Sequence, residues 1–238
     1  MSWLTSRLNK GTFRLPKGTV LSDWDKLSQL GELGPNMSAI AVRDAIKIFP
    51  TAFKAHLVAH GIDPKKATAI YTKFRDSGRR SAPWSAFSKR VPGRPQDGKD
   101  GNRINRWLLP PDHKYFADER TATLVEIKYF LQTLSMNNAP DLKNPRFSLA
   151  FKWLAGIPVV PGNYLDPITL LPIDFYDFMS APRQVTSGHI IPLDRGGKHE
   201  PENTFLMTRE SNMLQGNNTL PELIEMIAGI HERHKRHR

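Results

Sequence analysis

The stretch SGHIIPLDRGG, residues 187–197, places a histidine between a glycine and two isoleucines, close to a Gly-Gly pair. A neutral imidazole titrates near neutral pH, so His189 is suited to proton transfer if its ring is held in one pose. Asn203 follows His189 after 14 residues, and Asn212 follows Asn203 after 9. Each of the three residues also has a structural interpretation, because a lone histidine is often only hydrogen-bonded and asparagines near turns often cap backbone groups. Their order along the chain is what points to a site.

The elements around these residues follow from the local pattern. Val185 to Leu193 alternates enough for a strand that ends near Pro192, and Gly196-Gly197 predicts the turn that closes a hairpin. Asn203 to Thr208 is suited to the returning strand. Ser211 to Gly216 begins a helix, and residues 220–230 continue helically. The predicted order is strand, loop, strand, helix.

The stretches GHIIPLDRGG, PENTFLM and SNMLQG resemble the ββα-metal motif of the HNH endonuclease family, over about residues 164–230. The resemblance implies a small nuclease module that hydrolyses phosphodiester bonds. It implies that His189 is the general base, and that Asn212 binds Mg²⁺ or another divalent cation such as Mn²⁺. It further implies that Asn203 ties the loop between the strands and so fixes His189.

The sequence departs from the family at Gly188, where many members have an acidic metal ligand. One explanation is a dead site. The other, which we favour, is a metal held directly by Asn212 alone, with Gly188 leaving a coordination position to water. The related DRGH nucleases also have glycine before their histidine and bind metal through one asparagine. A further alternative is that Asp166, Asp174 or Asp177 reaches the metal.

The second departure is the absence of a zinc knuckle, because the chain has no cysteine. Where many relatives have cysteine pairs, this chain has DPIT and SN, which include Asp166 and Ser211. We therefore expect no structural zinc, and expect an apolar cluster to brace the motif instead. Its members are Leu170, Leu171, Ile173, Phe175, Tyr176 and Phe178.

Positive charge is concentrated in the first half of the chain. Residues 1–117 carry 21 Lys and Arg against 9 Asp and Glu, whereas residues 118–238 carry 13 against 14. This asymmetry favours a polyanionic partner, nucleic acid before membrane, although a merely solvated basic face is the alternative. The candidate nucleic-acid-binding residues are Lys65, Lys66, Arg79, Arg80, Arg94, Arg103, Arg106 and Arg195.

The N-terminal region is predicted to be rich in helices. One helix follows Ser38 and stops before Pro50, a second covers 51–60, and a third begins at Asp63-Pro64 and reaches Asp76. These helices, at about 38–76, resemble a helix-turn-helix domain. Residues 77–106 form a basic loop that also holds Trp84 and Phe87, and further helices are predicted at 121–134 and 145–155.

The sequence predicts an α+β protein with an α-rich DNA-binding region, residues 1–160, and a ββα-metal nuclease module, residues 161–238. We expect a Mg²⁺-dependent endonuclease that cuts double-stranded DNA, of the restriction type, and a homodimer if both strands are cut. The alternatives are a non-catalytic DNA-binding protein with a degenerate module and a nuclease acting on RNA. We expect a cytoplasmic protein, encoded by a bacterium or phage, with no membrane partner, because no apolar run has the length of a membrane span.

Overall fold

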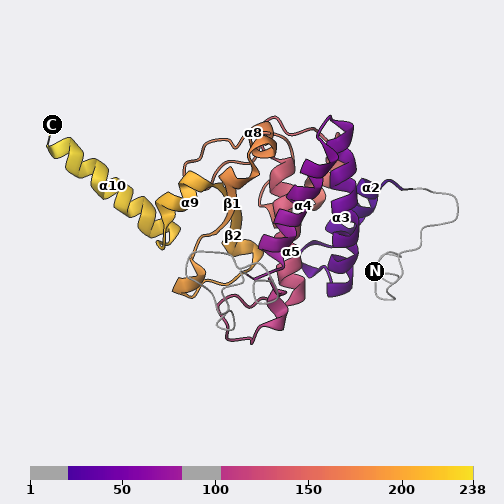
Figure 1. Cartoon of the computed structure of the whole chain (residues 1–238), viewed down its shortest axis with the longest axis horizontal. Helices are drawn as coiled ribbons and strands as arrows, with labels where there is room; N and C mark the ends of the chain where they lie inside the picture. Colours follow the sequence, from indigo (N-terminus) through magenta and orange to yellow (C-terminus); the bar gives the residue numbers. More distant parts are fainter. Residues whose placement is uncertain (1–20, 82–102, 238) are drawn as a thin grey trace.

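Helices precede and surround a two-stranded antiparallel sheet, so the protein is α+β (Figure 1). The computed structural model describes residues 21–81 and 103–237. The N-terminal helices are α2 (Asp23–Gly31), α3 (Ala39–Ala59), α4 (Pro64–Gly78), α5 (Glu119–Leu134), α6 (Pro145–Ala150) and α7 (Lys152–Ala155). The C-terminal elements are α8 (Phe175–Ser180), β1 (Val185–His189), β2 (Thr204–Thr208), α9 (Arg209–Gln215) and α10 (Leu220–Arg236). Short 3₁₀ turns lie at Gly34–Asn36, Arg106–Leu108, Pro182–Gln184, Leu193–Arg195 and Pro201–Asn203.

Helix α3 continues through Pro50, so the prediction of two helices that separate there was wrong. Proline removes one hydrogen bond from a helix interior. Phe49 and Phe53, on either side of Pro50, are both fully buried and both pack on Phe130 of α5. This aromatic packing holds the helix continuous and offsets the lost hydrogen bond.

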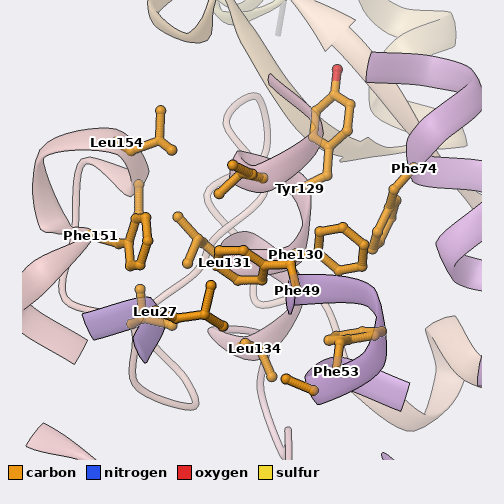
Figure 2. Packing of buried hydrophobic residues seen from close by; sticks show 14 of the residues in the cluster. Leu27, Phe49, Phe53, Phe74, Tyr129, Phe130, Leu131, Leu134, Phe151 and Leu154 are labelled. Atoms are coloured by element: carbon orange, nitrogen blue, oxygen red, sulfur yellow. The ribbon is translucent and has the colours of Figure 1, made fainter. Parts of the chain in front are cut away.

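Helix α5 is the centre of the protein, and its prediction from the sequence is confirmed. It packs against α3 and α4, and β2 also contacts it. Figure 2 shows Phe130 among Phe49, Phe53 and Phe74, with centroid distances of 5.0 to 5.7 Å between Phe130 and the other three rings. Because α5 is buried on nearly all sides, it connects the N-terminal helices to the sheet.

The hydrophobic core also extends past position 160. Phe178 of α8 stacks on Phe74 of α4 with 6.1 Å between ring centroids. Val185 of β1 and Leu206 of β2 belong to the same buried cluster as the helical residues. The helices and the sheet therefore share one core.

The two strands pair from Val185 opposite Thr208 to His189 opposite Thr204. Strand β1 is shorter than predicted and ends at His189. A longer loop with two 3₁₀ turns joins the strands, so the expected tight Gly-Gly hairpin was wrong. Gly196 has φ +83°, and a Cβ on Gly197 would lie 2.0 Å from the carbonyl oxygen of Ile191. Both glycines are therefore needed to fold this loop back on itself.

The free edge of β2 is covered by side chains from other elements. The amide of Leu206 donates to Gln132 Oε1 of α5 at 3.0 Å, and its carbonyl accepts from the hydroxyl of Tyr164. The amide of Thr208 donates to Asp166 Oδ2 at 2.8 Å. These contacts fix the sheet in place and leave this edge closed to further strand pairing.

Two further helical predictions had different outcomes. The stretch 145–155 is two short helices, α6 and α7, rather than one, and Leu149 is exposed on the first of them. Helices α9 and α10 both form, and α10 extends away from the rest of the molecule (Figure 1). Among the helices of residues 21–81 and 103–237, none is both long and apolar enough to cross a membrane.

Candidate active site

His189 is the last residue of β1, where the sheet meets the C-terminus of α4. Its Nε2 lies 3.1 Å from Nδ1 of His199. Nε2 of His199 lies 2.7 Å from the backbone oxygen of Gly78, the last residue of α4. His199 is 1% exposed, whereas His189 is half-buried. The histidine predicted as the general base therefore belongs to a chain of two imidazoles and one carbonyl.

Both imidazoles are neutral at pH 7. Burial lowers the pKa of His189 to about 4, and the positive charge of Arg106 acts in the same direction. Burial, Arg106 and His189 together lower the pKa of His199 well below its ordinary value. A neutral ring keeps one nitrogen lone pair, so His189 is able to accept a proton.

Nδ1 of His189 makes no hydrogen bond to the described residues, whereas Nε2 is engaged by His199. Nδ1 is therefore the ring nitrogen left for chemistry. This geometry is compatible with general-base chemistry at that atom.

Asn203 makes the loop contacts expected of it. Its Oδ1 accepts from the amide of Ile191 at 2.8 Å. Its Nδ2 donates to the carbonyl of Ile191 at 3.0 Å and to that of Lys198 at 2.8 Å. The loop on both sides of the Gly-Gly pair is thus tied to the start of β2, next to His189.

Asn212 lies on α9 with an exposed side chain that makes no hydrogen bond to the described residues. Gln215 follows three residues later, on a neighbouring part of the same helix face. Its Nε2 donates to the backbone oxygen of His189 at 2.7 Å. The side of α9 that carries Asn212 therefore adjoins the end of β1.

The ligands near His189 are compatible with a weakly held divalent cation. In residues 21–81 and 103–237, no three His, Cys, Asp or Glu side chains are grouped as metal ligands would be. The side chain of Asn212 offers a neutral, hard oxygen that accepts no hydrogen bond from the described residues. Mg²⁺ keeps several waters and is often bound by few protein ligands together with substrate phosphates, so this single oxygen fits it.

The expectation that Gly188 leaves a coordination position to water stays a prediction, but the space beside the residue is occupied. Gly188 is buried, and a Cβ built on it would lie 2.2 Å from Sδ of Met207 and 3.0 Å from Phe205. The space beside Gly188 is therefore filled by these two side chains of β2. A carboxylate at position 188 would require Met207 to repack.

Asp166 occupies the place of the missing zinc knuckle. Its Oδ1 accepts from the amides of Ile168 and Thr169 and from Oγ of Ser211, at 2.7 to 3.1 Å. Its Oδ2 accepts from the amide of Thr208, whose Oγ1 lies 2.9 Å from Oγ of Ser211. Asp166 thus joins the loop before α8, the end of β2 and the start of α9.

These contacts correct two expectations. Asp166 is fully buried with both oxygens bonded, so it is not free to bind a metal. The bracing by an apolar cluster was wrong for three of its members, because Leu170, Leu171 and Tyr176 are exposed; Leu170 is 68% exposed. The hydrogen bonds of Asp166 provide that bracing, while Ile173, Phe175 and Phe178 belong to the common core.

The other two candidate carboxylates lie on α8. Asp174 caps its N-terminus by accepting from the amides of Tyr176 and Asp177 at 2.8 and 3.0 Å, and it also accepts from Nδ2 of Asn138. Asp177 is exposed in the first turn of the same helix. Neither carboxylate contacts His189 or Asn212.

Arg106 is a structural residue, so its assignment to nucleic-acid binding was wrong. It is 6% exposed, and its guanidinium donates to the carbonyls of Gly78, Tyr115 and Ser77. Burial lowers its pKa to about 10. Its role is to hold the C-terminus of α4 beside the segment before α5.

The remaining basic candidates are placed differently from one another. Lys65 and Lys66 are exposed in the first turn of α4, and Arg103 is exposed while it donates to the carbonyl of Asp76. Arg80 pairs with Asp76 at 3.4 Å. Arg195 donates to Glu222 at 2.8 Å. Lys65, Lys66 and Arg103 therefore present exposed positive charge. Arg80 and Arg195 are each paired with a carboxylate.

Arg79 faces the interior instead. Its Nε lies 3.6 Å from Oε2 of Glu126, beyond hydrogen-bond distance, and both atoms are buried without a partner. Its guanidinium also lies over the ring of Trp107, 5.3 Å from the centroid. Arg94 and the aromatic residues of the basic loop, Trp84 and Phe87, lie outside the described residues.

Sequence reasoning missed His199 and Gln215. His199 stands in the polar stretch GGKHEPEN, where nothing distinguishes it from a solvated loop residue. Its partner Gly78 is 121 positions away along the chain. The one available signal was the presence of a second histidine inside the loop that Asn203 was expected to tie.

No protein family model matches the chain, and no curated protein matches it. Among solved structures, the chain is similar to one described as a crystal structure of a type II restriction endonuclease, with 24% sequence identity and a TM-score of 0.43. The match covers 56% of this chain and 62% of that one, so it spans less than two thirds of the neighbour's length. A partial likeness of this kind transfers no residue role to the chain.

Proposed function

We propose that the protein is a metal-dependent endonuclease that hydrolyses phosphodiester bonds in double-stranded DNA, of the sequence-specific restriction type. The observation that carries the proposal is the position of His189. It ends a strand of a ββα unit, its Nδ1 makes no hydrogen bond to the described residues, and the side-chain oxygen of Asn212 on the adjoining helix accepts none from them. The resemblance of this segment to the HNH family supports the same assignment.

The proposed reaction begins with a water molecule at Nδ1 of His189. The imidazole takes a proton from this water, and the water oxygen forms a bond to phosphorus. The bond between phosphorus and the leaving 3′ oxygen breaks, and that oxygen takes a proton from solvent. His189 then releases its proton, which its low pKa favours. Asn203 keeps the loop, and with it the imidazole, in place through both stages.

Asn212 would hold the divalent cation, Mg²⁺ or Mn²⁺, through its side-chain oxygen. When bound, such a cation stabilises negative charge on the phosphate and on the leaving oxygen. The remaining role of the protein is to position DNA. Lys65, Lys66 and Arg103 supply exposed positive charge, which contributes salt-dependent affinity for phosphates.

A homodimer is part of the proposal, because one module cuts one strand and a double-strand break needs two. A second candidate function is a DNA-binding protein whose nuclease module is inactive. The filled space beside Gly188 favours this alternative, since it leaves no room there for the acidic ligand that many HNH nucleases use.

The test is cleavage of supercoiled plasmid with Mg²⁺, with Mn²⁺ and with EDTA, beside structured RNA as the alternative substrate. We expect nicked and linear DNA with either metal and none in EDTA. His189→Ala should lower the cleavage rate by roughly 10²- to 10⁴-fold, the contribution of positioned proton transfer, while DNA affinity is unchanged. Asn212→Ala should lose nearly all activity, whereas Asn212→Asp should keep some because it retains an oxygen ligand.

The matched control is Asn217→Ala, an asparagine between α9 and α10 whose side chain makes no contact in the site. It should cut at the wild-type rate. Metal-dependent binding of DNA without any cleavage would support the non-catalytic alternative. Cleavage of RNA alone would change the substrate, and full activity of His189→Ala would refute the assignment of the base.

A further inference from the structure

The hydrogen-bond chain from Gly78 to His189 has only one possible direction. A backbone carbonyl can only accept, so Nε2 of His199 must carry the hydrogen that is donated to Gly78 over 2.7 Å. His199 is neutral, so its Nδ1 carries no hydrogen and can only accept. The partner at 3.1 Å, Nε2 of His189, must therefore be the donor.

This direction fixes the tautomer of His189. When Nε2 carries the hydrogen, Nδ1 has the lone pair, and Nδ1 is the nitrogen that is not bonded to the described residues. The carbonyl of Gly78 thus sets, through His199, which nitrogen of His189 is basic. We infer that His199 is a positioning residue that holds His189 in the one tautomer able to accept a proton from the nucleophilic water. This inference rests on the proposed function.

The carbonyl at the start of the chain is itself rigidly placed. The same Gly78 oxygen accepts from Nε of Arg106 at 3.2 Å. A Cβ on Gly78 would lie 2.8 Å from the Cα of Glu126, so only glycine permits α4 to approach α5 this closely. The helical region therefore determines the state of the nuclease histidine through direct contacts.

Two substitutions separate the two hydrogen bonds of His199. In His199→Asn, the side-chain oxygen takes the place of Nδ1 and can still accept from His189, but the donor to Gly78 is lost. In His199→Gln, the amide nitrogen takes the place of Nε2 and can still donate to Gly78, but the acceptor for His189 is lost. A positioning role and a purely structural role therefore predict opposite orders of activity.

We expect single-turnover DNA cleavage by His199→Gln to fall by roughly 10- to 100-fold, the usual loss when a partner that orients an imidazole is removed. His199→Asn should cut faster than His199→Gln even though it is the less stable of the two to thermal unfolding. DNA affinity should be the same in both. Equal rates, or a faster His199→Gln, would overturn the inference.

The matched control is His56, whose Nε2 likewise bonds a carbonyl, that of Pro140, at 2.9 Å and far from the site. His56→Asn and His56→Gln should both cut at the wild-type rate, although the former is also less stable. This control separates the loss of a buried histidine–carbonyl bond from an effect on His189.

A second measurement is independent of catalysis. Nitrogen chemical shifts of the histidine rings, measured by NMR on the full chain, report which nitrogen carries the hydrogen. We expect the Nε2–H form of His189 in the wild type and in His199→Asn, and a mixture of both forms in His199→Gln. A wild-type His189 in the Nδ1–H form would overturn the inference, whereas absence of nuclease activity with the expected tautomer would refute only the proposed function.

Discussion

At the scale of single residues, the site is built around a histidine that is kept neutral. Burial beside Arg106 lowers the pKa of His189 to about 4, so the ring is ready to accept a proton at any physiological pH. The same low pKa makes it a weaker base than an imidazole that titrates near 7. The fixed tautomer then matters more, because it removes the cost of finding the reactive arrangement.

The pH dependence of cleavage follows from this pKa. A general base acts in its unprotonated form, and His189 stays unprotonated down to about pH 4 because its pKa is depressed. We expect kcat/KM, which reports the free enzyme, to be nearly constant from pH 8 to about pH 5 and to fall below that. An acidic limb near 6.5 would mean that His189 titrates as an ordinary exposed histidine.

Stability must be followed in the same samples. The unfolded chain protonates both histidines near pH 6.5, whereas the folded chain resists protonation of His189 until about pH 4. The stability that these groups contribute is therefore complete above pH 6.5 and is lost as the pH falls towards 4. Circular dichroism at each pH distinguishes a loss of the base from a loss of the fold.

The sequence points to His189, Asn203 and Asn212 as candidates because all three lie within one short motif whose spacing is visible. It could not predict the role of His199 or the burial of Arg106. Both side chains hydrogen-bond to the backbone oxygen of Gly78, which lies 121 positions from His199 and 28 from Arg106 along the chain. A motif predicts chemistry within its own segment, and the partners that another segment supplies appear only in the fold.

At the scale of elements, the hydrogen bonds of Asp166 brace the ββα unit. The carboxylate of Asp166 accepts from three backbone amides and from Ser211, all without exposure to solvent. These hydrogen bonds together lower the pKa of Asp166 against the opposing effect of burial. Sequence inspection predicted that zinc was not needed, but it could not predict that Asp166 and Ser211 would meet.

Asp166→Asn tests this brace. The substitution keeps the shape of the side chain but removes the charge and turns one acceptor into a donor that faces other donors. We expect the free energy of unfolding to fall by roughly 2–4 kcal/mol, because several hydrogen bonds to a buried charged group are weakened or lost. Chemical denaturation at pH 7 measures the change, and EDTA should leave the wild-type curve unchanged if no metal braces the motif.

Asp177→Asn is the control for Asp166→Asn, because Asp177 is an exposed carboxylate on the neighbouring helix α8. It should change the free energy of unfolding by no more than about 0.5 kcal/mol, as surface substitutions usually do. If Asp166→Asn were equally mild, the hydrogen bonds of Asp166 would not be what holds β2 and α9 together.

Local patterns were sufficient for β2, α5 and α9, whose apolar spacing and caps are strong. The prediction failed at Pro50, where a local rule for ending helices was overridden by packing of Phe49 and Phe53 on α5. It failed again at the Gly-Gly pair, where the glycines serve a longer loop that Asn203 holds. At Pro50 a distant partner decided the outcome, and at the Gly-Gly pair the side chain of Asn203 did.

At the scale of the whole molecule, α10 is the element with unsatisfied packing. It extends from the body (Figure 1). Its apolar side chains Leu223, Met226, Ile227 and Ile230 follow the spacing of one helix face. Only Leu223 is buried, and Ile227 is 46% exposed. An exposed apolar face on a projecting helix is typical of a surface that a partner covers.

We propose that a second copy of the chain covers this face. Glu222 and Glu225 lie in the first half of α10, whereas Arg233, Lys235 and Arg236 lie in its last turns. Two copies of α10 that pack antiparallel would place the acidic half of one against the basic half of the other while their apolar faces meet. The same pairing would bring two copies of the candidate site into one dimer, as the proposed cleavage of both strands requires.

We therefore expect the full chain to sediment as a dimer, and Ile227→Glu to sediment as a monomer because a carboxylate cannot be buried unpaired in an apolar interface. The control is Glu232→Gln, which changes charge on the polar side of α10 and should remain a dimer. If α10 dimerisation serves double-strand cleavage, Ile227→Glu should still nick supercoiled plasmid but yield little linear product directly. A monomeric wild type at the concentrations of the cleavage assay would contradict the assignment of α10, and a dimeric Ile227→Glu would place the interface on another surface.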